Sequence, residues 1–247
     1  MKLQDFFVEN QRAALAFSGG VDSAYLLYAG LRCQADVRPY FVKTVFQPEF
    51  ELRDAQRLCR ELEIPLTVLE LDILALPGIG DNPANRCYGC KTAMLGLLRQ
   101  RAAADGYSLL LDGTNASDRG ENRPGMRALT ELQIQSPLRD CGLTKAEIRR
   151  LSREAGLFTG DKPAYACLAT RIPTEEPITA ELLARIEAAE DCLSALGFSD
   201  FRVRVFHGAA RLQFPGEQLD RAWAQRQRLV SALKPLFPIV LMDTEER

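Results

Sequence analysis

The sequence has 247 residues, 47% of them hydrophobic and 26% charged, which is typical of a globular protein and excludes a disordered or fibrous one. Lys and Arg number 31 against 33 Asp and Glu, a net charge of −2, so no global field attracts nucleic acid or an anionic membrane. The length suffices for one domain of about 150 residues with a smaller one beside it.

The N-terminal stretch MKLQDFFVENQR lacks the apolar core and cleavage site of a signal peptide, and no apolar run approaches the ~20 residues of a membrane span. We therefore expect a cytoplasmic protein that has neither a membrane nor a nucleic acid as partner. In that reducing compartment seven cysteines, an odd number, are considered first as metal ligands or reactive groups. His207 is the single histidine, which excludes any site that needs two, and we expect it to be an ordinary residue at a strand end.

Apolar, strand-like runs alternate with helical patterns through the first half of the chain. This alternation predicts an α/β domain, a parallel sheet with helices on both faces. The strand-like runs are AALAF, VRPYFVK, LTVLEL and SLLLD, and the helical patterns cover about residues 23–33, 49–63, 91–105 and 145–155.

The pattern changes in the last third of the chain. A helix is expected over 179–196, with Thr179 as its N-cap. Beyond Gly197 the order becomes FRVRVF, RLQF, a helix over about 217–234, and FPIVLM. Two strands, a helix and a strand predict a small C-terminal α+β domain. Its boundary is expected within 163–178, and we place it so that the domains are residues 1–165 and 166–247.

The strongest local signal is AFSGGVDSAYLL, in which a strand ends before Ser18 and a helix follows Ser23. The two glycines let the backbone approach an anion closely, and the helix N-terminus supplies unpaired N–H groups and a favourable dipole. No lysine follows the glycines as in a Walker P-loop, and the G-x-G-x-x-G fingerprint is absent. From the residues alone, a phosphate-binding loop and a plain strand-to-helix turn that needs glycine, with Asp22 and Ser23 as N-cap residues, both remain open.

The run from Ser18 to Ser23 resembles the SGGxDS loop of the PP-loop ATP pyrophosphatases. This resemblance implies a fold similar to the adenine nucleotide alpha hydrolases and cleavage of ATP between its α and β phosphates. It further implies that Mg²⁺ is bound near Asp22 and that a substrate oxygen becomes adenylated. A hard cation held by a carboxylate and substrate phosphates is the usual arrangement for magnesium.

Four further segments, NRCYGCK, DGTNASDRGENRPGMRA, SPLRDCGLTKAEIRRLSREAGL and DKPAYACLATRIP, resemble the LarE family in the same order, and the likeness runs from about Ala14 to Phe206. LarE proteins are sulfurtransferases of nickel-pincer nucleotide synthesis, which convert a pyridinium biscarboxylate mononucleotide to its thiocarboxylate form. The resemblance implies that ATP is bound by Ser18, Gly19, Gly20, Asp22, Ser23, Lys43, Gly113 and Thr114, with Lys43 near the adenine.

Each of these stretches also has a purely structural interpretation. DGTN after an apolar strand suits a turn, RPGMRA suits a Pro-Gly turn leading into a helix, and TKAEIRRL is a capped amphipathic helix. Arg202 and Arg204 alternate with valines and project from one strand face, either into solvent or toward a substrate phosphate. Arg171 and Lys91 are candidates to bind a substrate carboxylate or phosphate in the same way.

Cys167 lies in PAYACLATR, between Lys162 and Arg171, and positive charge on both sides favours its thiolate form. In the resembled family the matching cysteine is either a sacrificial sulfur donor that becomes dehydroalanine, or one of three ligands of a [4Fe-4S] cluster. Because Cys87 and Cys90 form a C-x-x-C that a single-cysteine donor does not need, we predict the cluster.

A redox pair, or a zinc site completed by Cys141 or His207, stays open for the C-x-x-C. We expect Cys33, Cys59 and Cys192 to be small buried side chains. Three rival functions remain: a tRNA thiolase, which would need a basic RNA-binding surface, an amidotransferase-type synthetase without sulfur chemistry, and an ATP-binding regulatory module. We expect a homo-oligomer acting on a small-molecule nucleotide.

Overall fold

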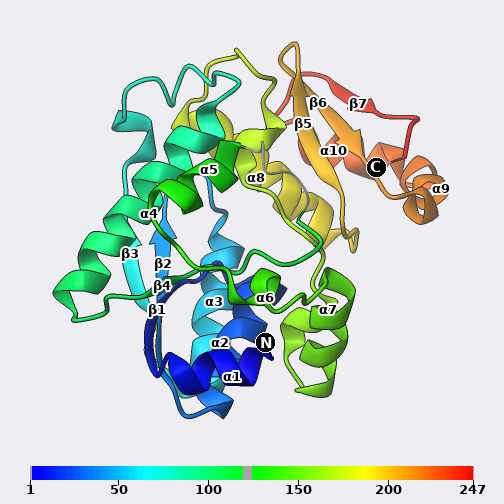
Figure 1. Ribbon diagram of the computed structural model, residues 1–247. Coiled ribbons are helices and arrows are strands. Elements are labelled where there is room, and N and C mark those ends of the chain that lie inside the picture. The colour runs from blue at the N-terminus through cyan, green and yellow to red at the C-terminus, as the bar shows by residue number, and fades with distance from the viewer. Residues whose placement is uncertain (1, 119–123, 247) are drawn as a thin grey trace. The chain divides into compact units, whose positions relative to one another are not determined.

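The computed structural model describes residues 2–118 and 124–246, which form two compact units (Figure 1). The first unit comprises Met1–Ile73 and Asn85–Lys162, and the second comprises Leu74–Ala84 and Pro163–Arg247. No sequence pattern predicts that residues 74–84 join the second unit. They are tied to it because the Asn82 side-chain amide donates to the carbonyl of Pro173 (2.7 Å) and the Ile178 N–H donates to the carbonyl of Gly80 (2.7 Å).

The first unit contains the predicted parallel sheet, in the strand order β3-β2-β1-β4. The central strand β1 pairs in parallel with both neighbours, so that Ala14 lies opposite Arg38 of β2 and Leu110 of β4. The carboxyl ends of all four strands therefore meet at one edge of the sheet. The strands are Arg12–Ala16 (β1), Asp36–Lys43 (β2), Thr67–Glu70 (β3) and Leu110–Leu111 (β4).

Both faces of this sheet are covered by helices, as predicted. Ala13 and Leu15 of β1 belong to one apolar cluster with side chains of α1, α2 and α3, whereas Ala14 belongs to a second cluster with side chains of α4 and α5. Burial on two faces explains why the strands read as continuous apolar runs. The helices of this unit are Leu3–Glu9 (α1), Val21–Arg32 (α2), Glu49–Glu61 (α3), Arg86–Ala104 (α4), Pro124–Glu131 (α5), Pro137–Asp140 (α6) and Lys145–Glu154 (α7), with a short 3₁₀ turn at Phe158–Asp161 (η2). A further 3₁₀ turn, Ile73–Ala75 (η1), begins with the last residue of the segment Met1–Ile73 and continues into residues of the second unit.

The segment RPGMRA differs from its structural interpretation. Its Pro-Gly pair opens helix α5 instead of forming a turn before it, because proline is well suited to the first position of a helix. Arg123, the first residue of RPGMRA, lies outside the described residues. So do residues 119–122, which precede it in the longer segment DGTNASDRGENRPGMRA.

The second unit contains a three-stranded sheet in which β5 and β6 are antiparallel and β6 and β7 are parallel. Its elements follow the predicted order, but the helix expected over 217–234 is divided in two. Gln225 ends α9 and precedes α10 with φ −97° and ψ 12°, outside helical geometry. The elements are Leu168–Arg171 (η3), Ala180–Ala195 (α8), Arg202–Phe206 (β5), Ala209–Gln213 (β6), Gly216–Ala224 (α9), Arg226–Leu233 (α10) and Val240–Met242 (β7).

Candidate functional site

The loop from Ser18 to Ser23 connects β1 to α2 at the carboxyl edge of the sheet. Gly19 has φ +70°, and a Cβ there would lie 3.1 Å from Cβ of Ala55, so both the backbone and the space exclude a side chain. The Ser18 and Ser23 hydroxyls are 3.1 Å apart, and Ser23 Oγ donates to the carbonyl of Gly20 (3.2 Å). These contacts fix the loop at the N-terminus of a 12-residue helix, the arrangement that binds phosphate groups.

Asp22, in the first turn of α2, is held by two side chains from distant parts of the sequence. Its Oδ2 lies 2.5 Å from Nζ of Lys145, and its Oδ1 accepts a hydrogen bond from the side-chain amide of Asn115 (3.3 Å). Lys145 is in turn fixed because its N–H donates to Oγ of Ser117 (3.0 Å). The carboxylate is therefore placed beside the phosphate loop and paired with a cation.

Lys145 and Asn115 are site residues that the sequence reasoning missed. The capping box of Thr144 and Glu147, which the structure contains, explains the start of α7 without any role for the lysine. One signal was present: Lys145 is the first residue of a helix, where the dipole disfavours a cation. A lysine in that position suggests a partner outside the helix.

Gly113 and Thr114 follow β4 and adjoin the same loop. A Cβ on Gly113 would lie only 2.9 Å from the backbone nitrogen of Ser23, so the two backbones can approach only with glycine here. The Thr114 hydroxyl donates to the buried carboxylate of Asp112, whose other oxygen accepts a hydrogen bond from Ser136 (2.6 Å). The structure thus brings Gly113 next to the Ser18–Ser23 loop and fixes Thr114 beside it.

Replacing Gly113 with alanine tests this close approach. We expect kcat/KM for ATP to fall about ten- to a hundredfold, because the added methyl must displace the backbone at Ser23 by a fraction of an ångström. Steady-state kinetics of pyrophosphate release would measure the change. Gly96→Ala in α4 is the matched control, since a Cβ there meets nothing within 4 Å. Equal kinetics for the two variants would contradict a nucleotide site at Gly113.

Lys43 ends β2, one strand away from the loop. Its ammonium donates to the carbonyl of Gln47 (2.6 Å) and pairs with Glu49 (2.6 Å). It therefore lies at the carboxyl edge of the sheet, the edge where open α/β sheets bind ligands, but its contacts are with the connection that follows its own strand.

The two cysteines of the C-x-x-C lie in the first two turns of α4, three residues apart and therefore on one side of the helix. Cys87 is exposed and Cys90 is buried, and Lys91 beside them is exposed. Cys167 belongs to the second unit, where it precedes η3 and is partly exposed. Within the described part of either unit, no three His, Cys, Asp or Glu side chains are placed to hold a metal. The predicted cluster would need ligands from both units and stays a prediction.

The remaining cysteines and the histidine have structural surroundings. Cys59 is buried in the core of the first unit, and burial raises the pKa of its thiol to about 12. Burial also raises the pKa of Cys141, and Cys33 packs against the same core. Cys192, on α8, is only partly buried. His207 is exposed, with φ +48° in the turn between β5 and β6, as expected for a strand-end residue.

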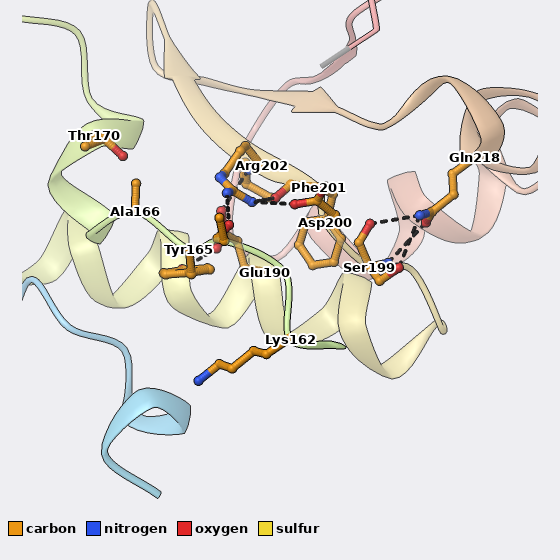
Figure 2. Close-up of polar contacts among 12 residues, drawn as sticks. Lys162, Tyr165, Ala166, Thr170, Glu190, Ser199, Asp200, Phe201, Arg202 and Gln218 are labelled. Atoms are coloured by element: carbon orange, nitrogen blue, oxygen red, sulfur yellow. Dashed lines mark hydrogen bonds and ion pairs between the residues drawn. The ribbon is translucent and has the colours of Figure 1, made fainter. Parts of the chain in front are cut away.

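The three arginines predicted to contact substrate are all engaged with protein groups in the second unit. Arg171 is 1% exposed and pairs with Glu190, with Nε 2.7 Å from Oε1. Arg202 is also buried and donates to backbone carbonyls, whereas Arg204 is half-buried and donates to the side chain of Gln213 (2.6 Å). Figure 2 shows Arg202 and Glu190 among these polar contacts. Arg171 is thus better placed to hold protein structure than to meet a ligand.

Comparison with known proteins relates the whole chain to one group. No protein-family model matches it. The chain is 39% identical to an uncharacterised protein of Synechocystis sp. over 222 residues, which cover 89% of this chain and 82% of that protein. It is 28% identical to an uncharacterised protein of Methanocaldococcus jannaschii over 226 residues, 92% of this chain and 86% of that protein.

A third relative has a named activity. Over 236 residues the chain is 30% identical to the pyridinium-3,5-bisthiocarboxylic acid mononucleotide synthase of Lactiplantibacillus plantarum, and the match covers 94% of this chain and 86% of that enzyme. The match covers nearly the whole chain and therefore includes residues of both units. The chain belongs to the family of the pyridinium-3,5-bisthiocarboxylic acid mononucleotide synthases, the LarE family.

Proposed function

We propose that the protein is an ATP-dependent sulfurtransferase that adenylates a carboxylate of a pyridinium mononucleotide and replaces one carboxylate oxygen with sulfur. The observation that carries this proposal is the Ser18–Ser23 loop, with Asp22 and Gly113 packed against it, in a chain related over nearly its full length to an enzyme named for a bisthiocarboxylic acid product. The loop is suited to bind pyrophosphate. The relative's name supports a pyridinium carboxylate mononucleotide as the acceptor of sulfur.

In the first step the carboxylate oxygen attacks the α phosphorus of ATP, and pyrophosphate leaves. The N–H groups of the glycine loop and the α2 N-terminus would stabilise the charge on the departing pyrophosphate. Asp22 has the hard carboxylate donor that Mg²⁺ prefers, and a bound Mg²⁺ would neutralise phosphate charge there. Lys145, which pairs with Asp22, is positioned to bind phosphate oxygens as a second cation. We assign Lys43, Gly113 and Thr114 to the nucleoside side of the same site.

In the second step a sulfur nucleophile attacks the acyl carbon, a C–S bond forms, and the bond to AMP breaks. No histidine base is required, because the nucleophile is already anionic. Lys91, which is exposed, and Arg204, which is half-buried, would bind the carboxylate or phosphate of the substrate, whereas Arg202, predicted for the same role, is buried and donates to the carbonyl of Ala164. Cys87 and Cys90, on one side of α4, suit two ligands of a [4Fe-4S] cluster whose third ligand is Cys167. When bound, this cluster would supply the sulfur as an exchangeable sulfide.

The alternative within the same family is that Cys167 donates its own sulfur. Its thiolate would form the thioester with the acyl group, after which the Cβ–Sγ bond breaks with loss of the Cα proton. The product keeps the sulfur, the chain keeps dehydroalanine, and one protein makes one turnover.

Iron and acid-labile sulfide, measured on protein purified without oxygen, separate the two sources of sulfur. The cluster predicts about four irons per chain, lost in both Cys87→Ala and Cys167→Ala. Wild-type protein that stays free of iron after anaerobic reconstitution would contradict the cluster. In that case a mass loss equal to one H₂S after turnover would identify Cys167 as the donor.

Pyrophosphate release tests the proposal against its rivals. With ATP and a pyridinium dicarboxylate mononucleotide we expect release of pyrophosphate and AMP, whereas a regulatory module would bind ATP without cleaving it.

Within the described ranges, no helix combines the length and the apolar composition needed to cross a membrane. The cytoplasmic location and the homo-oligomeric state stay predictions.

A further inference from the structure

Glu190 is a carboxylate buried in the second unit, with both of its oxygens engaged. It lies on α8 and is 5% exposed. Oε1 accepts hydrogen bonds from Arg171 Nε (2.7 Å) and from the N–H of Val203 (3.0 Å). Oε2 accepts from the hydroxyl of Tyr165 and from Arg171 Nη2 (3.3 Å). One acidic group thus joins α8, β5 and the segment that carries Cys167 (Figure 2).

The arginines around Glu190 bind the backbone on both sides of Cys167. They do so through carbonyl oxygens, which are fixed points of the chain rather than mobile side chains. The carbonyl acceptors are Ala164 for Arg202 (2.7 Å), Ala166 for Arg171 (3.2 Å) and Thr170 for Arg204 (2.6 Å). The segment from Ala164 to Thr170, which we call the Cys167 segment, is therefore held at three places by guanidinium groups.

Two side chains of the same segment, Tyr165 and Thr170, make further contacts. The guanidiniums of Arg171 and Arg202 both lie over the ring of Tyr165, 4.7 and 5.3 Å from its centroid. Thr170 donates from Oγ1 to the carbonyl of Cys167 (2.8 Å) and accepts from Arg171 Nη1 (2.9 Å). Arg171 is thus connected through Thr170 to the backbone of the cysteine itself.

The chemistry of this arrangement requires Glu190. A buried guanidinium is stable only when its charge is paired and its N–H donors have acceptors. Two N–H groups of the planar guanidinium bound to one carboxylate meet both conditions. Without the carboxylate, Arg171 would be an unpaired buried cation, and both Tyr165 and the N–H of Val203 would lose their acceptor. Arg171 would then turn toward water and release the carbonyl of Ala166.

We propose that Glu190 is a positioning residue for Cys167. Through Arg171 and Tyr165, Glu190 holds the Cys167 segment in one conformation. The role of that segment in sulfur transfer rests on the proposed function, but its restraint by Glu190 does not. Under this proposal, Arg171 supports the backbone around Cys167 and does not bind the substrate.

Peptide-resolved hydrogen–deuterium exchange on the full chain tests the restraint directly. In Glu190→Gln we expect the amides of residues 164–170 to exchange about ten- to a hundredfold faster, the scale of one hydrogen bond to a charged group. The amides of α8, and those of β5 other than Val203, whose N–H donates to Glu190, should keep their wild-type rates. Asp191→Asn is the matched control, the same chemical change on an exposed residue of the same helix, and should leave the Cys167 segment unchanged.

The double variant Glu190→Gln with Arg171→Met separates positioning from stability. Removing both charges takes away the unpaired cation, so the melting temperature should return toward that of the wild type. Exchange in the Cys167 segment should stay fast, because the carbonyl of Ala166 still lacks Arg171 and the hydroxyl of Tyr165 still lacks the Glu190 carboxylate. Slow exchange in Glu190→Gln, restored slow exchange in the double variant, or faster exchange throughout residues 163–246 in the double variant would each overturn the proposal.

Kinetics add a readout that a purely structural residue would not produce. For sulfur transfer by Glu190→Gln we expect a lower kcat with KM for the nucleotide substrate unchanged. A raised KM with kcat preserved would mean that Glu190 contacts the substrate, which would overturn the positioning role. If wild-type protein transfers no sulfur, the proposed function fails, and the exchange experiment still decides whether Glu190 restrains the segment.

Discussion

Cys167→Ala is expected to lower sulfur transfer by at least about a thousandfold, the scale on which an enzyme loses rate when its nucleophile is removed. Release of pyrophosphate in the presence of the carboxylate substrate should persist, because the phosphate loop and Asp22 belong to the first unit and do not include this cysteine. Mass spectrometry of the thiocarboxylate product, alongside a pyrophosphate assay, would measure the two steps separately.

Cys192→Ala is the matched control, since it removes a partly buried thiol from the same unit and should leave both steps unchanged. Cys87→Ala then separates the two sources of sulfur, because it abolishes transfer if a cluster is needed and spares it if Cys167 donates its own sulfur. Product formation by Cys167→Ala at the wild-type rate would show that the sulfur passes through another residue.

The fold of the first unit could be predicted because its determinants are local. Each strand is a short apolar run bounded by a helical pattern, and burial on both sides, as at Ala13 and Ala14 of β1, follows directly from such a run. The break of the C-terminal helix at Gln225 could not be predicted in this way, because the stretch AWAQRQRL, which runs through Gln225, contains no helix-breaking residue. The inclusion of residues 74–84 in the second unit depends on hydrogen bonds to residues about a hundred positions later.

The same distinction holds for the candidate site: features built from contiguous residues were predicted, and contacts between distant residues were not. The Ser18–Ser23 loop was found because its glycines, aspartate and helix start are contiguous. Lys145 was missed because its ion pair with Asp22 joins residues 123 positions apart. The pattern RVRV placed Arg202 and Arg204 on one face of a strand, but it carried no information about the carbonyls of Ala164 and Thr170 that they bind. A sequence pattern reveals which side chains share a face, not what they meet there.

Asp22→Asn is expected to lower the rate of pyrophosphate release by about a thousandfold or more, since the site would lose the charge that balances Lys145 and that, in the proposed function, would hold Mg²⁺. The change preserves the shape of the side chain, and the melting temperature should move little because the Asp22–Lys145 pair is partly exposed.

Asp36→Asn is the control for this substitution, because it removes a carboxylate that also pairs with a cation, Arg12, but at the amino end of β2. Asp36 lies at the edge of the sheet opposite to the phosphate loop, so its loss should leave the rate of pyrophosphate release unchanged. Raising the Mg²⁺ concentration offers a further discrimination: a variant that lacks a metal ligand should recover part of its rate, whereas a variant that merely distorts the loop should not. If Asp22→Asn retained the wild-type rate at low Mg²⁺, the carboxylate would have no part in the metal site, and the pairing with Lys145 would be structural alone.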